Sequence, residues 1–333
     1  MRPVDLTLVR GGTSRGPVLR LDAAPPPGPE RDRFARAVVL GSGALADGLG
    51  GGTATTAKIV LVGPGDDGLD YLVGNLDPTS DVVDWSGTCG NMTAAVVPSA
   101  VADGLLPPGT ARVRLRNLAT NGRVDVSVAD PAALDRPGDE VRLTTTYRDP
   151  GGAVLGAVLP TGSARDVLDV DGERVDATIV DVTHPYLLVP QAQAEGRLEK
   201  VRSAACLRLG LVDDPADAAR LSAAVPRLLL LYPEAGAADL RITAVSMGQP
   251  IDTVPVTAAM ALAAAARIAG TLVEGLGSER GLRVASPSAT LDAHAEVDGA
   301  AVVSAAVDRT ARILLRGRAW VPTAHTATRS TIS

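Results

Sequence analysis

One cysteine lies where acid–base chemistry would be favoured. Cys89 stands in the sequence Gly-Thr-Cys-Gly-Asn at residues 87–91, directly before an apolar stretch that predicts a helix beginning at 89–91 and continuing to residue 102. The free N–H groups at a helix N-terminus carry partial positive charge, which stabilises a thiolate and can hold a carboxylate. Cys89 is therefore a candidate general base, and Gly90 and Asn91 are candidate substrate contacts. The alternative is that Cys89 is a small buried side chain beside a tight turn.

A lysine is the second residue with a potential catalytic role. Lys58 interrupts an otherwise apolar stretch that predicts a strand over residues 57–62, and Lys200 is the only other lysine in the chain. Burial at the start of a strand favours the neutral amine, which can exchange protons with a substrate. A surface lysine whose stem packs on apolar neighbours is the commoner explanation of such a pattern. The other cysteine, Cys206, lies in an ordinary helical apolar pattern and is expected in the core.

A short glycine-rich loop at residues 10–16 has the composition of an anion-binding turn. Its sequence, Arg-Gly-Gly-Thr-Ser-Arg-Gly, supplies backbone N–H groups, two hydroxyls and two guanidinium groups. Gly11, Gly12, Thr13 and Ser14 can together surround a carboxylate or a phosphate. The loop lacks the Gly-Lys-Ser/Thr ending of a nucleotide-binding loop, so nucleotide binding is not expected. A plain hairpin turn between two strands is the simpler interpretation.

The sequence contains no pattern typical of a metal or cofactor site. The three histidines, His184, His294 and His325, show no metal-ligand spacing, and there is no Cys/His cluster. A nucleophile elbow and a dinucleotide fingerprint are also missing from the sequence. We therefore expect neither a metal ion nor an organic cofactor.

Composition and charge exclude several classes of partner. The net charge of −6 and the pI near 5.2 argue against nucleic acid, which binds basic surfaces. Two cysteines fit a reducing cytoplasm, and residues 1–10 contain no apolar segment typical of a signal peptide. The apolar stretch 254–273 is mostly alanine and contains Arg267, which predicts a buried helix over 257–273 and no membrane span. A small-molecule partner is the remaining expectation.

The pattern of elements predicts a sheet-rich chain in two similar halves. Hydrophobic residues make up 46% but aromatic residues only 2%, and 35 glycines and 24 prolines favour many short strands over a helical bundle. Each half carries several strands and one alanine-rich helix, whose small side chains let strands surround it. We expect the halves at 1–178 and 179–315, with a cleft between them. A final segment, 316–333, should return toward the first half and end in a frayed tail.

Four short motifs occur together in the order typical of one enzyme family. The sequences Arg-Gly-Gly-Thr-Ser-Arg-Gly at 10–16, Thr-Ala-Lys-Ile-Val at 56–60, Gly-Thr-Cys-Gly-Asn-Met at 87–92 and Arg-Thr-Ala-Arg at 309–312 resemble the PrpF-type isomerases. The resemblance spans most of the chain and implies an α+β, diaminopimelate-epimerase-like fold. In that fold each half is a barrel-like, mostly antiparallel sheet around a central helix, and the active site lies in the cleft between the halves.

The resemblance also implies roles for individual residues. Cys89 and Lys58 fall on the family's acid–base pair, and residues 11–14 fall on a region that contacts a substrate carboxylate. Further substrate contacts are implied at Thr56, Gly90, Asn91, His184, Met247, Ser286 and Ser288. Related epimerases carry a second cysteine at the start of the second central helix, where this chain has Pro-Val-Thr at 255–257. A Cys–Lys pair is therefore favoured over a pair of thiols.

The sequence departs from the family pattern at some of these positions. An Asn-Pro pair of the family is His184-Pro185 here, and His-Pro-Ser-Gly is represented by Ser-Pro-Ser-Ala at 286–289. His184 either faces the substrate, as the asparagine does in related epimerases, or packs between the halves. These changes leave the identity of the substrate open.

The resemblance implies a cytoplasmic, cofactor-independent isomerase or tautomerase. Such an enzyme shifts a proton and a double bond along three carbons of a small unsaturated di- or tricarboxylate. Two alternatives stay open: a racemase or epimerase with unequal bases, and a non-catalytic carboxylate-binding protein on the same fold. The expected partner is a small carboxylate, with no nucleic acid and no membrane, and a homodimer is one assembly to consider.

Overall fold

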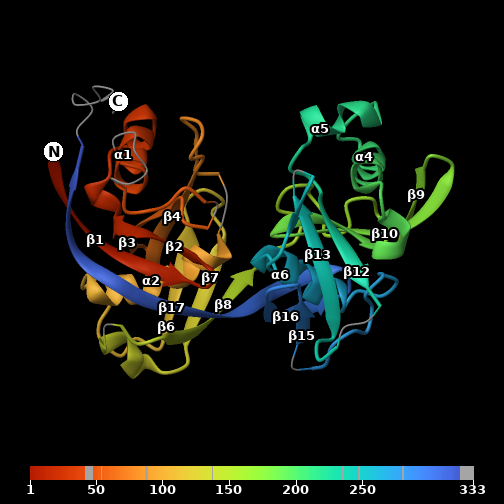
Figure 1. Ribbon diagram of the computed structural model, residues 1–333. Coiled ribbons are helices and arrows are strands. Elements are labelled where there is room, and N and C mark those ends of the chain that lie inside the picture. Colours follow the sequence, from red (N-terminus) through yellow and green to blue (C-terminus); the bar gives the residue numbers. More distant parts are fainter. Residues whose placement is uncertain are drawn as a thin grey trace. The chain divides into compact units, whose positions relative to one another are not determined.

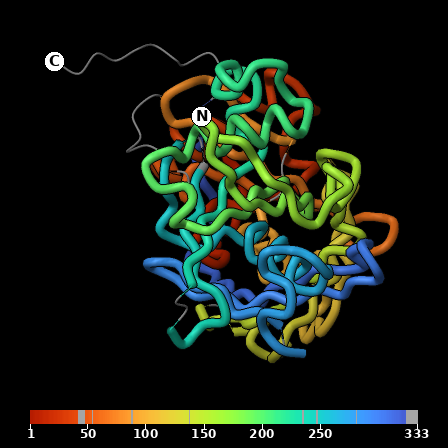
Figure 2. The backbone as a smooth tube through the Cα atoms, turned by 90° about the vertical axis from the view of Figure 1, so that its right-hand side faces the viewer, coloured from red at the N-terminus to blue at the C-terminus, as the bar shows by residue number. Residues whose placement is uncertain are grey.

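The computed structural model describes residues 1–41, 48–53, 55–86, 89–136, 138–233, 236–246, 248–279 and 281–322. The chain forms two compact units, whose elements are labelled in Figure 1. Unit 1 comprises Met1–Thr145 and the segment from Arg309 onward, and unit 2 comprises Thr146–Asp308. In the backbone trace of Figure 2, unit 1 therefore takes the red-to-yellow part of the chain and its blue end.

The boundary after the first unit lies earlier in the chain than the expected residue 178. Thr178 lies inside β10 (Glu173–Val182), where its hydroxyl donates to the carbonyl of Ala164 and accepts from the N–H of Leu272. Both partners belong to unit 2. The sequence showed only that strands continue through this region, whereas the pairing assigns them to the second unit.

Unit 1 contains, in chain order, β1 (Arg2–Gly11), β2 (Ser14–Arg20), a 3₁₀ turn (Leu21–Ala23), α1 (Pro29–Val39), β3 (Lys58–Gly65), β4 (Gly68–Leu76), β5 (Val83–Asp84), α2 (Gly90–Ala102), β6 (Arg112–Asn117), β7 (Arg123–Val128), a second 3₁₀ turn (Pro131–Asp135) and the start of β8 (Val141–Arg148). The last strand, β17 (Ala301–Val321), begins in unit 2 and ends in unit 1.

The strands of unit 1 follow a mixed pairing order. β1 lies between β2 and β17 and is antiparallel to both. β2 pairs with β3 in parallel, β3 with β4 antiparallel, and β4 with the short β5 antiparallel and with β6 in parallel. β6 and β7 form the predicted antiparallel hairpin, in which Asn121 has a positive φ of 55°.

Helix α2 is the centre of unit 1. It packs against β1, β2, β3 and β4, and every residue from Met92 to Ala100 is buried. A helix that is apolar on all sides needs neighbours on all sides, and its many small side chains allow the strands to approach. The prediction of a helix from 89–91 to residue 102 is confirmed.

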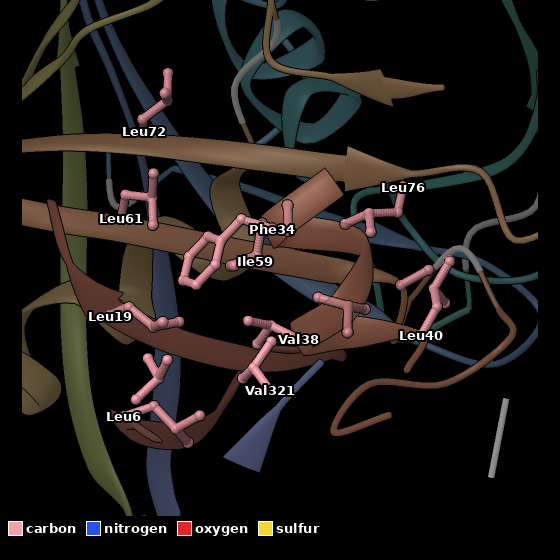
Figure 3. Close-up of a cluster of buried hydrophobic side chains, with 14 residues drawn as sticks. Leu6, Leu19, Phe34, Val38, Leu40, Ile59, Leu61, Leu72, Leu76 and Val321 are labelled. Atoms are coloured by element: carbon pink, nitrogen blue, oxygen red, sulfur yellow. The ribbon is translucent and has the colours of Figure 1, made fainter. Parts of the chain in front are cut away.

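The other face of the same strands packs against α1. Figure 3 shows this cluster, in which Phe34 and Val38 of α1 lie near Ile59 and Leu61 of β3. Val321, at the end of β17, completes the cluster. Because side chains alternate along a strand, the intervening residues of β3 face α2 instead. This alternation places the first residue of β3 on the α2 side.

Unit 2 contains β9 (Asp166–Val170), β10 (Glu173–Val182), β11 (His184–Pro190), α3 (Gln191–Ala194), α4 (Leu198–Arg208), a 3₁₀ turn (Pro215–Asp217), α5 (Ala218–Leu221), β12 (Arg227–Tyr232), β13 (Leu240–Ser246), β14 (Gln249–Ile251), α6 (Val256–Ala265), β15 (Leu282–Ala285) and β16 (Thr290–Asp298). β10 pairs with β11 antiparallel, β11 with β12 in parallel, and β12 with β13 antiparallel. β13 then pairs with β14 antiparallel and with β15 in parallel, and β15 pairs with β16 antiparallel. This repeats the order from β1 to β7, with α6 in the place of α2. The expected two similar halves are confirmed.

Helix α6 is shorter than the sequence predicted. It is buried from Ala258 to Ala265, but it ends there and does not continue to residue 273. Thr271 donates its hydroxyl to the carbonyl of Ala265 at 2.7 Å, so the following turn satisfies the end of the helix. Gly270 provides the turn with a positive φ of 86°. Neither α6 nor any other helix of the described residues is long and apolar enough to cross a membrane.

The cluster between α1 and β3 should dominate the stability of unit 1. Leu61 is fully buried in it, so Leu61→Ala removes apolar contacts and leaves a cavity. We expect the free energy of unfolding to fall by about 2–5 kcal/mol. Both tryptophans, Trp85 and Trp320, lie in unit 1, so urea unfolding followed by tryptophan fluorescence reports this unit. Leu314→Ala, at a side chain that is 40% exposed, is the control and should change the value by less than about 0.5 kcal/mol.

Candidate active site

Cys89 directly precedes α2 and caps it through its backbone alone. Its carbonyl accepts hydrogen bonds from the N–H of Thr93 at 2.8 Å and from the Thr93 hydroxyl at 3.0 Å. The Cys89 side chain makes no capping hydrogen bond to any residue that the structure describes, and it is partly exposed. The thiol is therefore available to a ligand at a helix end whose first N–H groups lack helical partners. Gly87 and Thr88, just before it, lie outside the described residues.

Asn91 links the first turn of α2 to the glycine-rich loop. Its Nδ2 donates to the hydroxyl oxygen of Thr13 at 2.9 Å and to that of Ser14 at 3.3 Å. Its Oδ1 is buried and has no hydrogen-bond partner within the described part of the chain. Three of the predicted substrate contacts are thus in direct contact with one another.

Two glycines allow the loop to lie directly on α2. A Cβ atom at Gly11 would overlap the backbone carbonyl of Asn91, and one at Gly12 would overlap its Oδ1. Gly12 also has a positive φ of 50°. Arg10 fixes the loop, because its Nη1 donates to the carbonyl of Gly12 at 2.9 Å and to the hydroxyl of Thr310 at 3.0 Å. The motifs at 10–16, 87–92 and 309–312 therefore belong to one contact network of unit 1.

Lys58 begins β3 and lies on its α2 side. Its Nζ donates to Oδ1 of Asn75 at 2.6 Å, and Asn75 is the residue directly opposite on β4. Gly16 separates β3 from α2: a Cβ atom there would press against the carbonyl of Lys58 and would also contact Met92 of the helix. No direct hydrogen bond joins Lys58 to Cys89 among the residues described. Lys58 begins β3, Cys89 precedes α2, and β3 packs against α2.

Asn75 is a contact that the sequence analysis missed. Gly65 and Gly68 close the turn between β3 and β4, and counting outward from them places Lys58 opposite Asn75. The signal was therefore the distance of each residue from the turn. As an amide, Asn75 accepts the hydrogen bond without carrying a negative charge, so the amine of Lys58 is oriented but not paired with an anion.

Thr56 lies in the turn that leads into β3. Its hydroxyl contacts that of Thr53 at 2.7 Å, and Thr53 contacts the hydroxyl of Thr55 at 3.1 Å. This cluster is exposed and lies two residues before Lys58. Thr56 stays a predicted substrate contact, and its hydroxyl contacts that of Thr53.

The remaining predicted contacts belong to unit 2. The hydroxyls of Ser286 and Ser288 both donate to the carbonyl of Asp252, at 2.7 and 2.9 Å. These bonds hold the segment that leads into α6, which gives both serines a role in local structure. Met247 lies outside the described residues.

His184 begins β11 and packs within unit 2. Its Nε2 lies 3.1 Å from the carbonyl of Ala224, and its ring meets Tyr186 edge-on with 5.6 Å between centroids. Burial, together with the charge of Arg227, lowers the pKa of His184 from 6.5 to about 4. Because a carbonyl can only accept, Nε2 carries the hydrogen in the neutral ring and Nδ1 is bare.

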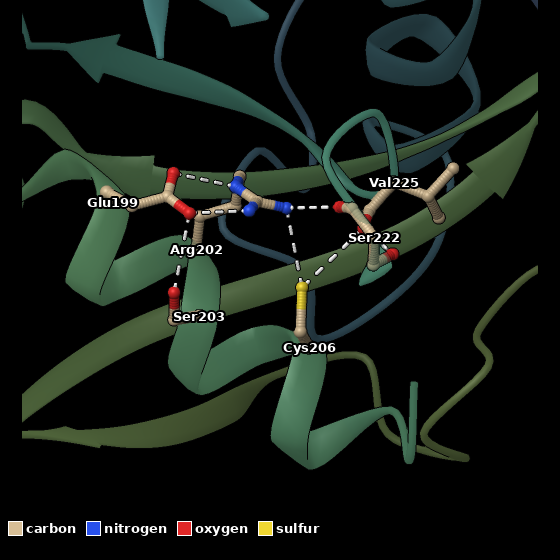
Figure 4. Close-up of polar contacts among 6 residues, drawn as sticks. All are labelled: Glu199, Arg202, Ser203, Cys206, Ser222 and Val225. Atoms are coloured by element: carbon tan, nitrogen blue, oxygen red, sulfur yellow. Dashed lines mark hydrogen bonds and ion pairs between the residues drawn. The ribbon is translucent and has the colours of Figure 1, made fainter. Parts of the chain in front are cut away.

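Cys206 is buried in α4, as its sequence pattern predicted. Its sulfur lies 3.5 Å from Nη1 of Arg202 and 3.5 Å from the carbonyl oxygen of Val225. Figure 4 shows these contacts. Arg202 also binds Glu199 and the carbonyl of Ser222. Burial raises the pKa of Cys206. The thiol is therefore part of a closed polar cluster.

The polar groups around α2 suit an organic anion. Within the described residues, no group of three or more His, Cys, Asp or Glu side chains could hold a metal ion. The side chains that meet at α2 are instead hydroxyls and an amide, joined by the N–H groups of the helix start. Such groups can donate hydrogen bonds to a carboxylate.

The low pKa of His184 predicts a stability loss in acid. Between pH 6.5 and 4 the unfolded chain binds a proton at His184 that the folded chain excludes. The free energy of unfolding is therefore at its full value above pH 6.5 and falls as the pH is lowered to 4. We expect a loss of about 2–3 kcal/mol from this residue. Urea unfolding of the wild type and of His184→Asn at pH 7 and at pH 4.5 measures it as a difference. Equal acid sensitivity of the two proteins would contradict it.

Comparison with known proteins identifies the family. A family model described as PrpF protein matches residues 1–196 and 190–322. The 2-methyl-aconitate isomerase of Shewanella oneidensis is 30% identical over 96% of this chain and 97% of that protein. The 4-oxalomesaconate tautomerase of Pseudomonas putida is 28% identical over 93% of this chain and 94% of that protein.

The similarity extends to a solved structure. The crystal structure of methylitaconate-delta-isomerase superposes with a TM-score of 0.81 and 27% identity over 96% of both chains. This confirms the expected diaminopimelate-epimerase-like fold, and the named relatives place the chain among isomerases. Its ordered motifs, its repeated topology and these similarities lead to one conclusion: the chain belongs to the PrpF family.

Proposed function

We propose that this protein is a cofactor-independent isomerase that moves a proton and a double bond along a small unsaturated di- or tricarboxylate. The observation that carries the proposal is the partly exposed Cys89 at the N-terminus of α2, two residues before Asn91, which holds the hydroxyls of Thr13 and Ser14. Relatives named for methylaconitate, oxalomesaconate and methylitaconate support the substrate class.

Cys89 and Lys58 act as the acid–base pair in this proposal. One of them removes a proton from the carbon next to a carboxylate, or from the far end of the conjugated alkene. The negative charge then spreads over a dienolate, which hydrogen-bond donors stabilise in a site with little water. The other group returns a proton at the opposite end of the three-carbon unit. The reaction is redox-neutral, so it needs no oxidant or reductant.

Asn91 gives the loop hydroxyls a direction. Because its Nδ2 donates to both Thr13 and Ser14, each oxygen already accepts a hydrogen bond and its own hydrogen stays free to point elsewhere. Two donor hydroxyls and the N–H groups of α2 then form one cradle for a carboxylate. In the proposed reaction this cradle orients the substrate against the thiol.

The arrangement favours one thiol over two. Helix α6 begins after Pro255, so the residue equivalent to Cys89 carries no acid–base group. Cys206, the other thiol, is buried in α4 and bonded within its own cluster. A racemase that uses one cysteine from each half therefore lacks its second residue here.

Proton exchange with solvent tests the proposed pair. In deuterated water, proton NMR of the wild type with a panel of unsaturated polycarboxylates should show deuterium entering the substrate and the alkene signals moving. Cys89→Ala and Lys58→Met should each slow exchange by about 10²–10⁴-fold, because each removes an acid–base group. Cys206→Ala and Lys200→Met are matched controls that should keep the wild-type rate. Exchange at a single stereocentre without alkene movement, or wild-type rates in either test variant, would refute the proposal.

The partner of Lys58 predicts a change in pH dependence. Asn75→Asp keeps the shape of the side chain but places a carboxylate 2.6 Å from Nζ, which favours the ammonium. The limb of the pH–rate profile that belongs to Lys58 should move to higher pH by about one unit or more, whether the lysine acts as acid or as base. Asn121→Asp, in an exposed turn, is the control and should leave the profile unchanged. An unmoved limb in Asn75→Asp would separate Lys58 from the chemistry.

A further inference from the structure

Unit 2 repeats the framework of the candidate site with different side chains. β12 takes the place that β3 has in unit 1, and it begins at Arg227 as β3 begins at Lys58. β11 takes the place of β2, and it begins at His184 as β2 begins at Ser14. The position that holds a titratable amine in one unit thus holds a permanently charged guanidinium in the other.

Arg227 is a partly buried cation without a counter-ion. Its Nε is buried and has no acceptor, and no hydrogen bond or ion pair joins its guanidinium to any residue that the structure describes. Elsewhere in unit 2, Arg208, Arg220 and Arg283 each pair with an aspartate. Removing a guanidinium from water is unfavourable unless an acceptor replaces that water. Arg227 therefore has the surroundings of a side chain whose partner is a ligand.

Arg227 and His184 lie on the same face of the sheet. Tyr186 is paired with Arg227 across the parallel β11–β12 ladder, and its hydroxyl contacts that of Thr257 in α6 at 2.6 Å. Partners across a ladder share a face, and so do residues two apart along a strand, so His184 lies on this face as well. The neighbouring Leu187 points the other way, into the cluster beneath α4. The cationic face is thus the one turned toward α6.

We propose that Arg227 and His184 form a carboxylate-binding site within unit 2. The planar guanidinium offers two parallel N–H donors, which match the two oxygens of a carboxylate. His184 is neutral and has a bare Nδ1 while the site is empty. An arriving carboxylate favours protonation of this ring, and the new Nδ1–H adds a donor.

The identity of the ligand as a carboxylate of the substrate rests on the proposed function. The site itself rests on the unpaired guanidinium and its imidazole neighbour, and it does not require that Cys89 and Lys58 perform the proposed chemistry. A permanent positive charge attracts a polycarboxylate substrate. Arginine supplies such a charge at the position where unit 1 has a lysine.

Binding of propane-1,2,3-tricarboxylate tests the site, because this saturated acid cannot undergo the allylic shift. Calorimetry on the full chain should show binding to the wild type and at least tenfold weaker binding to Arg227→Met. Arg227→Lys should bind with intermediate strength, since it keeps the charge but loses the paired donors. Arg283→Met, at an exposed arginine paired with Asp292, is the matched control and should bind as the wild type does.

NMR of His184 provides a second readout that does not depend on activity. At about pH 5.5, its ring ¹⁵N signals should move toward the protonated form when the tricarboxylate is added to the wild type or to Lys58→Met. They should not move in Arg227→Met, and inorganic phosphate should move them less. No tricarboxylate binding to the wild type, equal affinity in Arg227→Met, or a static His184 signal would each overturn the inference. Arg227-dependent binding by a protein that shows no solvent exchange would instead refute the proposed reaction and support this site.

Discussion

The candidate site depends on a close approach between a loop and a helix end. The loop after β1 lies on the first turn of α2 only because Gly11 and Gly12 lack side chains, which would occupy the positions of the Asn91 carbonyl and Oδ1. This approach lets Asn91 hold Thr13 and Ser14, and it fixes the two hydroxyls at the first turn of the helix. One steric condition therefore determines where the two hydroxyls lie relative to the N-terminus of α2.

The two units show one framework with two chemistries. Each places a parallel strand pair and a central helix in the same order, and each begins the equivalent strand with a cation, Lys58 or Arg227. In unit 1 the helix is preceded by Cys89, and in unit 2 by Pro255. Unit 1 therefore retains groups that can exchange protons, whereas unit 2 retains a fixed charge that can only bind. This division agrees with the proposed isomerase, which needs one proton shuttle and binds a polyanionic substrate.

Neither cation is neutralised by a carboxylate within the described residues. Lys58 donates to an amide, and Arg227 has no partner there, although the chain has 38 acidic residues and several exposed arginines, such as Arg283 and Arg318, pair with them. A carboxylate beside either cation would compete with an anionic substrate. Burial and the charge of Arg227 lower the pKa of His184, so the ring adds no second positive charge beside Arg227 at neutral pH. The protein thus keeps its positive charges available in spite of its net charge of −6.

The sequence alone determined the fold class, the central helices and the first set of site residues. Alanine-rich helices predicted strands packed around them, and the ordered motifs around Cys89 and Lys58 indicated the PrpF family. It could not determine that Asn75 faces Lys58, that Arg227 stands in the equivalent place of the second unit, or that α6 ends at Ala265. Those facts depend on strand register and on hydrogen bonds between residues far apart in the chain. Local composition specifies which element forms, but only the tertiary pairing of elements decides which side chains meet.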